Sequence, residues 1–405
     1  MKARFFLFLI AAVIVMPFSL VAAEEEKNAL ADGNNQFALD LYAKIKSKEG
    51  NLFFSPYSIT TAFGLLQAGA KNETADQIAD VFNFPENVNE LNEAFRKFQS
   101  HLNELGLKGD IQLSVANALW AQKKYSFLES YLRAAKKYYD AQLTNLDFFN
   151  PVQACKQINE WVEKKTHSKI KNLVSPGAVS PQTQLILTNA IYFFGHWDKA
   201  FKKEDTQEAA DFYLENKAAV KAAMMFQKEK FSYGENDDLQ ALELPYKGRA
   251  LSMIVLLPKK RDGLAGLENE LDEEKLKTWL AVLGTPQEVQ VYLPKFKMES
   301  SFSLSETLAG MGMSDAFDAK ADFSGIDGGK SLFISAVLHK AFVEVDEKGT
   351  EAAAATAIIM SKTAFMPEKL PVVFKADHPF LFLIRENASG AILFWGRMSN
   401  PNTAM

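Results

Sequence analysis

The sequence has only one cysteine among its 405 residues, Cys155. No disulfide can therefore form within the chain, and a secreted scaffold held together by cross-links is excluded. The fold must depend on an apolar core, which 48% hydrophobic and 12% aromatic residues can supply. An excess of positive charge is also missing, because the formal net charge is −5. This charge argues against nucleic acid as a partner.

Histidine is scarce as well: there are five, and none has another histidine four positions away. The zinc-protease motif His-Glu-x-x-His and the serine-hydrolase motif Gly-x-Ser-x-Gly are both absent. The segment 325–331, Gly-Ile-Asp-Gly-Gly-Lys-Ser, is not a phosphate-binding loop, because Ser324 stands where its first glycine should be. A polar turn is the better interpretation. We therefore expect no enzyme activity, no cofactor and no metal.

Only one long apolar run occurs, at 5–23. It follows the basic start Met-Lys-Ala-Arg and ends in Val-Ala-Ala before Glu24, which is typical of a secretory signal peptide. A membrane anchor is the alternative, but Pro17 and the small residues at the end of the run favour cleavage. We predict a signal peptide at 1–23 and one domain at 24–405. The mature protein would be secreted and free of the membrane, or periplasmic or at the cell surface if its host is a bacterium.

Helix and strand patterns are mixed along the chain. Apolar residues at helical spacing predict helices at 34–48, 58–66, 74–82, 91–105, 127–139 and 152–166. Strands are predicted at 112–120, 184–194, 250–257 and 288–293, with a hairpin formed by 380–384 and 391–395. The absence of a repeat or a regular βαβ alternation indicates a single α+β domain. Asn72 and Asn387 begin sequons, which matter only in a host that glycosylates.

The segment 347–367 gives contradictory local signals. Its four consecutive alanines after Glu351 favour a short helix. It nevertheless follows the strand-like run 341–345, ends in Met-Pro and has no apolar stripe with which a helix could dock. Small uncharged residues at alternate positions would instead let it slide between two strands. Helix, exposed loop and inserted strand all remain open.

Six motifs, in order over nearly all of 30–401, resemble those of the serpin family. They are Asn51-Leu-Phe-Phe-Ser-Pro-Tyr-Ser58, Asn189-Ala-Ile-Tyr-Phe-Phe-Gly-His-Trp197, Leu293-Pro-Lys295, Leu338-His-Lys-Ala341, the hinge Glu347-Lys-Gly-Thr-Glu-Ala-Ala-Ala-Ala-Thr356, and His378-Pro-Phe380 with Ile392-Leu-Phe-Trp-Gly-Arg397. The resemblance implies three sheets, about nine helices and an exposed reactive-centre loop near 347–367. It also implies that a serine protease cleaves this loop and becomes acyl-linked, and that the loop then inserts into the main sheet as an extra strand.

The composition of the hinge agrees with insertion. The hinge comprises Glu347, Gly349, Thr350, Glu351, Ala352, Ala353, Ala354, Ala355 and Thr356. Alternate side chains of an inserted strand face the core, and from Thr350 onward these are all small or β-branched, as far as Ile358. Glu351 falls on the opposite face, where it stays hydrated. The unbroken run favours an active inhibitor over a non-inhibitory serpin that acts as a binding protein.

Family position implies two further groups of residues. Four would form a hydrogen-bond cluster where the main sheet opens: Ser55, Ser58, Asn189 and His339. A purely structural role for these bonds in the core is compatible with that assignment. Glu347 and Lys295 would pair at the top of the opening, near Trp197.

The same resemblance implies which bond the protease attacks. Counting from Gly349 gives Thr363–Ala364, which suits an elastase-like protease with a small pocket. Lys362–Thr363 suits a trypsin-like protease, and Phe365–Met366 a chymotrypsin-like one. We rank the first bond above the second and allow that both are used. The expected partner is a serine protease in a covalent complex with a monomeric inhibitor, and a cysteine protease is the alternative target.

Overall fold

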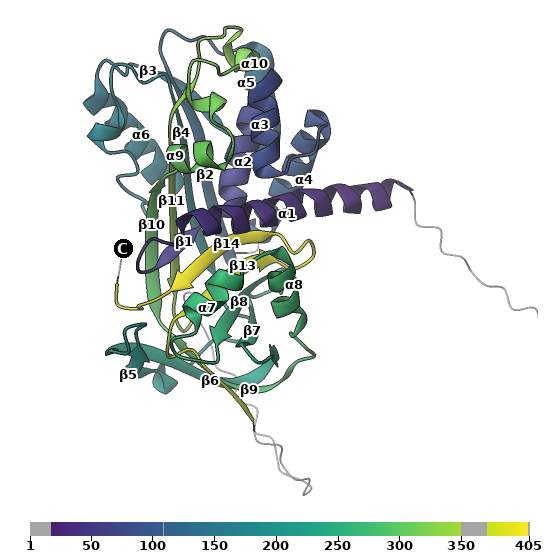
Figure 1. Ribbon diagram of the computed structural model, residues 1–405, viewed down its shortest axis with the longest axis vertical. Helices are drawn as coiled ribbons and strands as arrows, with labels where there is room; N and C mark the ends of the chain where they lie inside the picture. The colour runs from purple at the N-terminus through teal and green to yellow at the C-terminus, as the bar shows by residue number, and fades with distance from the viewer. Residues whose placement is uncertain (1–17, 108, 350–370, 404–405) are drawn as a thin grey trace, which may run out of the picture.

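The computed structural model describes residues 18–107, 109–349 and 371–403 (Figure 1). The described residues form ten α-helices and fourteen strands, and the predicted α+β class with about nine helices is confirmed. The helices are α1 (Phe18–Ile45), α2 (Pro56–Gln67), α3 (Asn72–Phe82), α4 (Val88–Leu107), α5 (Glu129–Tyr139), α6 (Pro151–Lys165), α7 (Leu264–Glu270), α8 (Glu273–Ala281), α9 (Ser305–Met311) and α10 (Ser324–Asp327). The strands are β1 (Leu52–Phe54), β2 (Ile111–Gln122), β3 (Gln142–Leu146), β4 (Leu185–Gly195), β5 (Gln207–Tyr213), β6 (Ala219–Glu235), β7 (Leu239–Pro245), β8 (Leu251–Pro258), β9 (Gln287–Pro294), β10 (Phe296–Ser303), β11 (Ile334–Val345), β12 (Val372–Lys375), β13 (Phe380–Glu386) and β14 (Ile392–Met398).

The strands make three sheets, as expected. The main sheet has the order β10-β11-β4-β2-β3. The second runs β1-β14-β13-β8-β7-β6, and it contains the predicted C-terminal hairpin as β13 and β14. The third is built from β5, β6, β9 and β12. It shares β6 with the second sheet, because 224–231 of this strand pairs with β9 while 232–235 pairs with β7.

Helices cover both faces of the main sheet (Figure 1). Helices α2 and α4 pack on one face, and α6 lies on the other. The α6 layer buries Ile158 and Val162 against apolar side chains of three strands, including Trp120 of β2, Ile186 of β4 and Leu338 of β11. The apolar side chains of α6 therefore contact both β4 and β11 across the boundary between these two strands.

The first helix differs from its predicted bounds of 34–48. Helix α1 begins at Phe18 and ends at Ile45. Its apolar face extends back through Leu30, which is buried, and this lengthens the helix beyond the predicted start. At the other end the chain turns within 46–50, where Gly50 has a φ of +79° that favours glycine.

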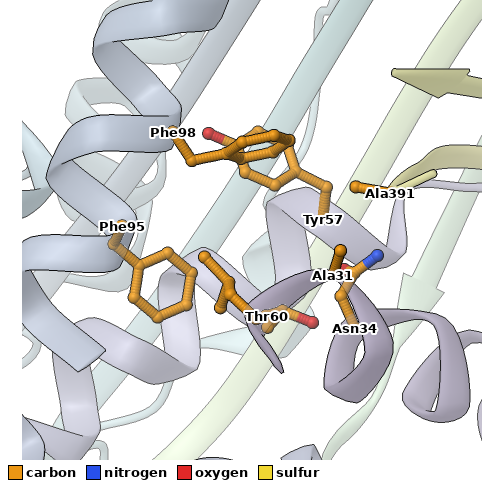
Figure 2. Close-up of a pocket in the computed structure, with 8 residues that line it drawn as sticks. Ala31, Asn34, Tyr57, Thr60, Phe95, Phe98 and Ala391 are labelled. Carbon is orange, nitrogen blue, oxygen red and sulfur yellow. The ribbon is translucent and has the colours of Figure 1, made fainter. Parts of the chain in front are cut away.

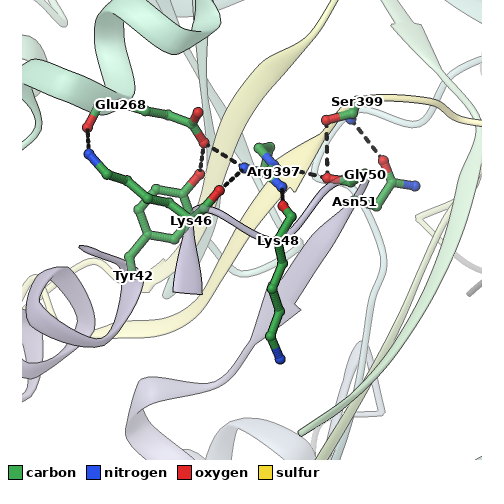
Figure 3. Close-up of polar contacts among 8 residues, drawn as sticks. All are labelled: Tyr42, Lys46, Lys48, Gly50, Asn51, Glu268, Arg397 and Ser399. Atoms are coloured by element: carbon green, nitrogen blue, oxygen red, sulfur yellow. Dashed lines mark hydrogen bonds and ion pairs between the residues drawn. The ribbon is translucent and has the colours of Figure 1, made fainter. Parts of the chain in front are cut away.

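Arg397, which ends the last sequence motif, fixes that turn to the core (Figure 3). Its side chain is 7% exposed and donates from Nε to the carbonyl of Gly50 at 2.9 Å. It also donates to the carbonyls of Lys46 and Lys48 and to Glu268 Oε1 of α7, the last at 3.0 Å. The end of α1, α7 and β14 are thus joined by one guanidinium, whose five donors suit several acceptors at once.

A small pocket lies where α1, α2 and α4 meet (Figure 2). Aromatic rings form one side of it, and Asn34 and Thr60 form the other. The Oδ1 atom of Asn34 and the Oγ1 atom of Thr60 are buried there without a protein hydrogen-bond partner. The space open to a water-sized sphere is about 10 Å³, which is room for about one water molecule and far below the size of a cofactor pocket.

Candidate functional site

The boundary between β4 and β11, which we call the seam, lies at the centre of the main sheet. The two strands are parallel and pair from Ile334 opposite Leu185 to Val343 opposite Phe193, with one register shift near Ala336. The strands on either side, β2 and β10, are antiparallel to their neighbours in the seam. The main sheet is therefore closed in this structure, with its central pair in the parallel arrangement.

The predicted cluster of Ser55, Ser58, Asn189 and His339 meets beneath the seam. Asn189 donates from Nδ2 to the carbonyl of Ser58 at 2.8 Å and to its hydroxyl at 2.5 Å. The same amide donates to Asn117 Oδ1 of β2, and Asn189 Oδ1 accepts from His339 Nδ1. The backbone N–H of Ser55 donates to His339 Nε2 at 3.2 Å. The cluster thus links β2, β4 and β11 to α2.

These contacts define the state of His339. Because Nε2 accepts a backbone hydrogen, the ring hydrogen of the neutral imidazole lies on Nδ1, where it points at the oxygen of Asn189. The side chain is fully buried. Burial lowers the pKa of His339 to about 3, and the hydrogen bond to Asn189 acts in the opposite direction. His339 therefore stays neutral across the whole physiological range.

We expect acid to destabilise the protein through His339. An unfolded histidine takes up a proton below about pH 6.5, whereas folded His339 does so only near pH 3. Stability should fall as pH drops from 6.5 toward 3, by about 1.4 kcal/mol per pH unit for this one proton. Urea midpoints measured from pH 7 to 4.5 test this. His339→Gln should flatten the slope; a wild-type midpoint that is constant over this range contradicts the prediction.

The hinge begins where β11 ends, directly above the seam. The turn 346–349 is closed by the N–H of Gly349 donating to Asp346 O at 3.2 Å. Trp197 holds this turn with two donors, Nε1 to Asp346 O at 2.9 Å and its backbone N–H to Lys348 O at 3.2 Å. Its ring stacks on Tyr246 with a centroid separation of 4.7 Å. The turn is therefore fixed to the end of β4.

Gly349 allows this close approach. Its φ is +75°, and a Cβ atom there would lie 2.3 Å from both Gly195 O and Trp197 N. Both atoms belong to the backbone, so they cannot move aside as a flexible side chain could. Only glycine fits where the hinge leaves the sheet.

Glu347 and Lys295 pair at this point, which is the contact that the family resemblance implied. Lys295 Nζ lies 3.0 Å from Glu347 Oε2, and Thr206 donates its hydroxyl to Oε1 at 2.9 Å. The Glu347 side chain is 8% exposed and that of Lys295 is 31% exposed. Burial alone would raise the pKa of Glu347, but hydrogen bonds from the backbone, Lys295 and Thr206 bring it below its ordinary value. The carboxylate is thus ionised and tied at three points.

Removing this pair should loosen the hinge by a small amount. Lys295→Ala is expected to lower the free energy of unfolding by about 1 kcal/mol, because Glu347 keeps only its neutral partners. Glu347→Gln should cost about as much, and the double variant little more than either, since one interaction is lost in each case. Denaturant titration of the four proteins measures the coupling. The more exposed pair Lys297–Glu344 is the control, where Lys297→Ala should cost less than about 0.5 kcal/mol. Fully additive losses at Lys295 and Glu347 would contradict the coupling.

The structure does not describe every residue proposed from the sequence. It brings together the cluster around His339 and, separately, the hinge residues Glu347 and Gly349 with Trp197 and Lys295. The remaining hinge positions and the candidate bonds lie outside the described residues: Thr350, Glu351, Ala352, Ala353, Ala354, Ala355, Thr356, Lys362, Thr363, Ala364 and Phe365. Asn117 and Thr206 were not predicted, although they bond directly to Asn189 and Glu347.

Comparisons with known proteins agree with these features. A family model described as Serpin (serine protease inhibitor) matches residues 32–401. Human Serpin B3 is 44% identical over 393 residues, covering 92% of this chain and all of that protein. Human leukocyte elastase inhibitor is 43% identical over 383 residues, covering 92% and 99%.

Two solved structures have the same fold. Uncleaved ovalbumin aligns with a TM-score of 0.82 at 34% identity, covering 92% of this chain and 100% of that one. Human thyroxine-binding globulin in complex with thyroxine aligns with a TM-score of 0.84 at 29% identity, covering 93% and 100%. With the family model and these relatives extending over nearly the whole sequence, the chain belongs to the serpin family of serine protease inhibitors.

Proposed function

We propose that this protein inhibits a serine protease as a suicide substrate. The observation that carries the proposal is the parallel seam with the hinge mounted directly above it. A strand that turned back after Gly349 would run antiparallel to β11 and, since β4 is parallel to β11, antiparallel to β4 as well. Both new ladders would be of the antiparallel kind, which is slightly more stable per residue than the parallel pairing that they replace.

The register of β11 supports the prediction that Thr350 and the alternate residues after it would face the core after insertion. After the four-residue turn 346–349, Thr350 would lie opposite Val345, Ala352 opposite Val343, and so on in steps of two. Val345, Val343 and Ala341 are all buried in the main core. Residues directly opposite in an antiparallel pair share a face of the sheet, so the small residues of the hinge would enter the core and Glu351 would not.

The same register bears on the cleaved bond. If it continues without a shift along the whole of β11, Ser361 would lie opposite Ile334, the first residue of β11, and twelve residues would fill a seam of about 40 Å. Lys362 and Thr363 follow immediately beyond the end of the strand. A protease acyl-linked at either residue would be held at the end of the main sheet where β11 begins, opposite the end from which the hinge starts. This supports cleavage at Thr363–Ala364 or Lys362–Thr363 over Phe365–Met366.

Complex formation with proteases tests the proposal. The full chain is incubated separately with an elastase, trypsin, chymotrypsin and papain, and each mixture is analysed by denaturing electrophoresis. We expect a complex that resists SDS with at least one serine protease, together with a released C-terminal peptide. Sequencing that peptide identifies the bond: Ala364 first for the elastase-like target, Thr363 for the trypsin-like one. Cleavage by every serine protease without any complex contradicts inhibition, and a complex with papain alone shifts the target to cysteine proteases.

A binding role without inhibition is the second candidate, and one observation favours it. The thyroxine-bound globulin shows that this fold can carry a small ligand. The hinge argues against that role here, because its alternate residues are small and uncharged as far as Thr356. Cleavage of the loop separates the two functions: an inhibitor should gain thermal stability when its cut loop inserts, and a binding protein should not.

We also propose that residues 1–23 direct the protein out of the cell. The basic start, the apolar run and the small residues before Glu24 support this. Among the described residues, no helix is long and apolar enough to cross a membrane. N-terminal sequencing of the exported protein should begin at Glu24, and export with Met1 retained would contradict cleavage.

A further inference from the structure

The two sequons lie at the ends of secondary-structure elements, and the structure holds their asparagines differently. Asn72 is the first residue of α3, and Asn387 follows the last residue of β13. An N-linked glycan replaces one of the two hydrogens on the Nδ2 atom of its asparagine with a bulky sugar. The contacts of each Nδ2 atom therefore decide which sequon the folded protein can carry in modified form.

Both Nδ2 hydrogens of Asn387 are used in the folded protein. The atom donates to the carbonyl of Arg249 at 2.9 Å and to the hydroxyl of Ser252 at 2.8 Å. Since a carbonyl can only accept, the amide cannot be turned around to put its oxygen in the place of Nδ2. The Oδ1 atom of Asn387 is buried, and so is the whole of Ser252. The side chain of this sequon is thus enclosed where a sugar would have to be attached.

A glycan at Asn387 would collide with these two acceptors. The sugar carbon would take the place of a hydrogen, about 1.45 Å from Nδ2, which in a straight hydrogen bond leaves about 1.4 Å to the acceptor oxygen. Rotation of the side chain would relieve the collision, and an open pocket of about 520 Å³ beside Asn387 has room for a sugar. That rotation would leave the buried hydroxyl of Ser252 and the carbonyl of Arg249 without their donor, which destabilises the folded state.

The backbone around Asn387 is also held in place. Its own N–H donates to the carbonyl of Ala250 at 2.8 Å. The carboxylate of Glu386, which is 1% exposed, accepts from the backbone N–H groups of Ala388 and Ser389 at 3.1 and 2.7 Å. A shift of the turn that made room for a sugar would break these bonds as well.

Asn72 has an exposed side chain and uses only one of its two amide hydrogens. Its Nδ2 atom donates to Asp322 Oδ2 at 2.8 Å, and no second acceptor for this atom lies among the residues that the structure describes. A sugar can replace the other hydrogen while this bond remains. Asp322 has further ties, because its N–H donates to Thr74 Oγ1 at 2.9 Å and its Oδ1 atom accepts from the N–H of Ser324 at 3.1 Å. The start of α3 therefore keeps its contacts when Asn72 is modified.

The hydroxyl groups of both sequons are engaged once the chain has folded. Thr74 is 1% exposed and its oxygen accepts from Asp322. The hydroxyl of Ser389 donates to Glu386 Oε2 at 2.5 Å. A transferring enzyme that reads Asn-x-Ser/Thr must therefore act before these bonds form. Folding then determines which modified chains reach the native state.

We propose that, in a host with an oligosaccharyltransferase, the exported folded protein carries an N-linked glycan at Asn72 and none at Asn387. In the transfer, Nδ2 of Asn72 loses a proton and bonds to the anomeric carbon of an oligosaccharide. The bond from that carbon to a polyprenyl diphosphate breaks, and the diphosphate leaves with the electron pair. A chain modified at Asn387 fails to close the turn between β13 and β14. The inference rests on the proposed export through residues 1–23 and is independent of protease inhibition.

Peptide mapping of exported protein tests the two sites. The full chain is produced in a yeast that glycosylates, and a second culture carries a yeast signal peptide in place of residues 1–23. The soluble exported protein is treated with a peptide-N-glycosidase in heavy-oxygen water, which converts each glycan-bearing asparagine to a labelled aspartate. Mass spectrometry then reads both positions. Asn72→Gln and Asn387→Gln are compared with wild type by the shift in mass on glycan removal.

We expect labelled aspartate at position 72 and unchanged asparagine at position 387. Asn72→Gln should lose the whole glycan mass, whereas Asn387→Gln should keep it. A glycan on Asn387 in the soluble exported protein overturns the proposal, and so does exported protein without a glycan on Asn72. Both readings come from wild type and hold even if a variant fails to fold. If only the culture with the yeast signal peptide exports the chain, the proposed export fails while the peptide map still decides the glycan sites.

Discussion

Replacing Thr350 by arginine is expected to turn the protein from an inhibitor into a substrate. By the register of β11, Thr350 would lie opposite Val345 and enter the main core with it. A guanidinium there would be buried without a partner, at a cost of several kcal/mol. Insertion would stall at its first residue, and the acyl-enzyme would hydrolyse instead. Thr350→Arg should be cleaved normally yet form at least tenfold less SDS-resistant complex than wild type.

The neighbouring position is the matched control. Glu351→Arg introduces the same side chain one residue later, on the face that stays in water. It would lie opposite Glu344, whose side chain is 21% exposed and already pairs with Lys297. We expect complex formation within about twofold of wild type. Equal complex yields from Thr350→Arg and wild type, or equal losses in both variants, would refute the inserted register.

Replacing Asn189 by alanine is expected to give the largest loss of stability of any single change considered. The side chain satisfies buried groups of Ser58, Asn117 and His339 at once. Its removal leaves these groups without partners in a dry environment, since Ser58 and His339 are fully buried. Each unsatisfied buried group costs about 1–3 kcal/mol, so the free energy of unfolding should fall by about 3 kcal/mol.

Thermal scans at a fixed heating rate measure this loss. Asn402→Ala is the control, because Asn402 is exposed and makes only local contacts and one bond to Lys221 O. It should leave the midpoint within about one degree of wild type. An Asn189→Ala protein that melts with the control would mean that water or rearranged side chains replace the bonds of the cluster.

Sequence patterns predicted the helices better than the strands. The ranges 58–66, 74–82, 91–105, 127–139 and 152–166 all correspond to observed helices, because each carries an apolar face that packs on a neighbour. The strand-like run at 341–345 proved to be only the last part of a longer strand, β11, which begins at Ile334. Strands β6 and β10 were missed, because charged and polar residues on their exposed faces dilute the apolar alternation.

The candidate site was only partly accessible to sequence reasoning. His339 and Asn189 were singled out from family position, and the structure brings them together. Asn117 could not be singled out, because its role depends on the pairing of β2 with β4, which places it directly opposite Asn189. Thr206 reaches Glu347 from a loop far away in sequence, before β5. Contacts of this kind depend on register and chain path, which no local pattern specifies.

The α6 layer limits how often β4 and β11 can separate at the seam. Its apolar side chains touch both β4 and β11, and Lys340 of β11 donates to the carbonyl of Lys171 in the segment that follows the helix. The two strands cannot separate while that layer keeps all of its contacts. Backbone amide hydrogens that bond across the seam will therefore exchange with deuterium only as often as α6 and the segment that follows it move away from the sheet together. The exchange rate at these positions therefore measures how often the seam opens in the uncleaved protein, before any protease is present.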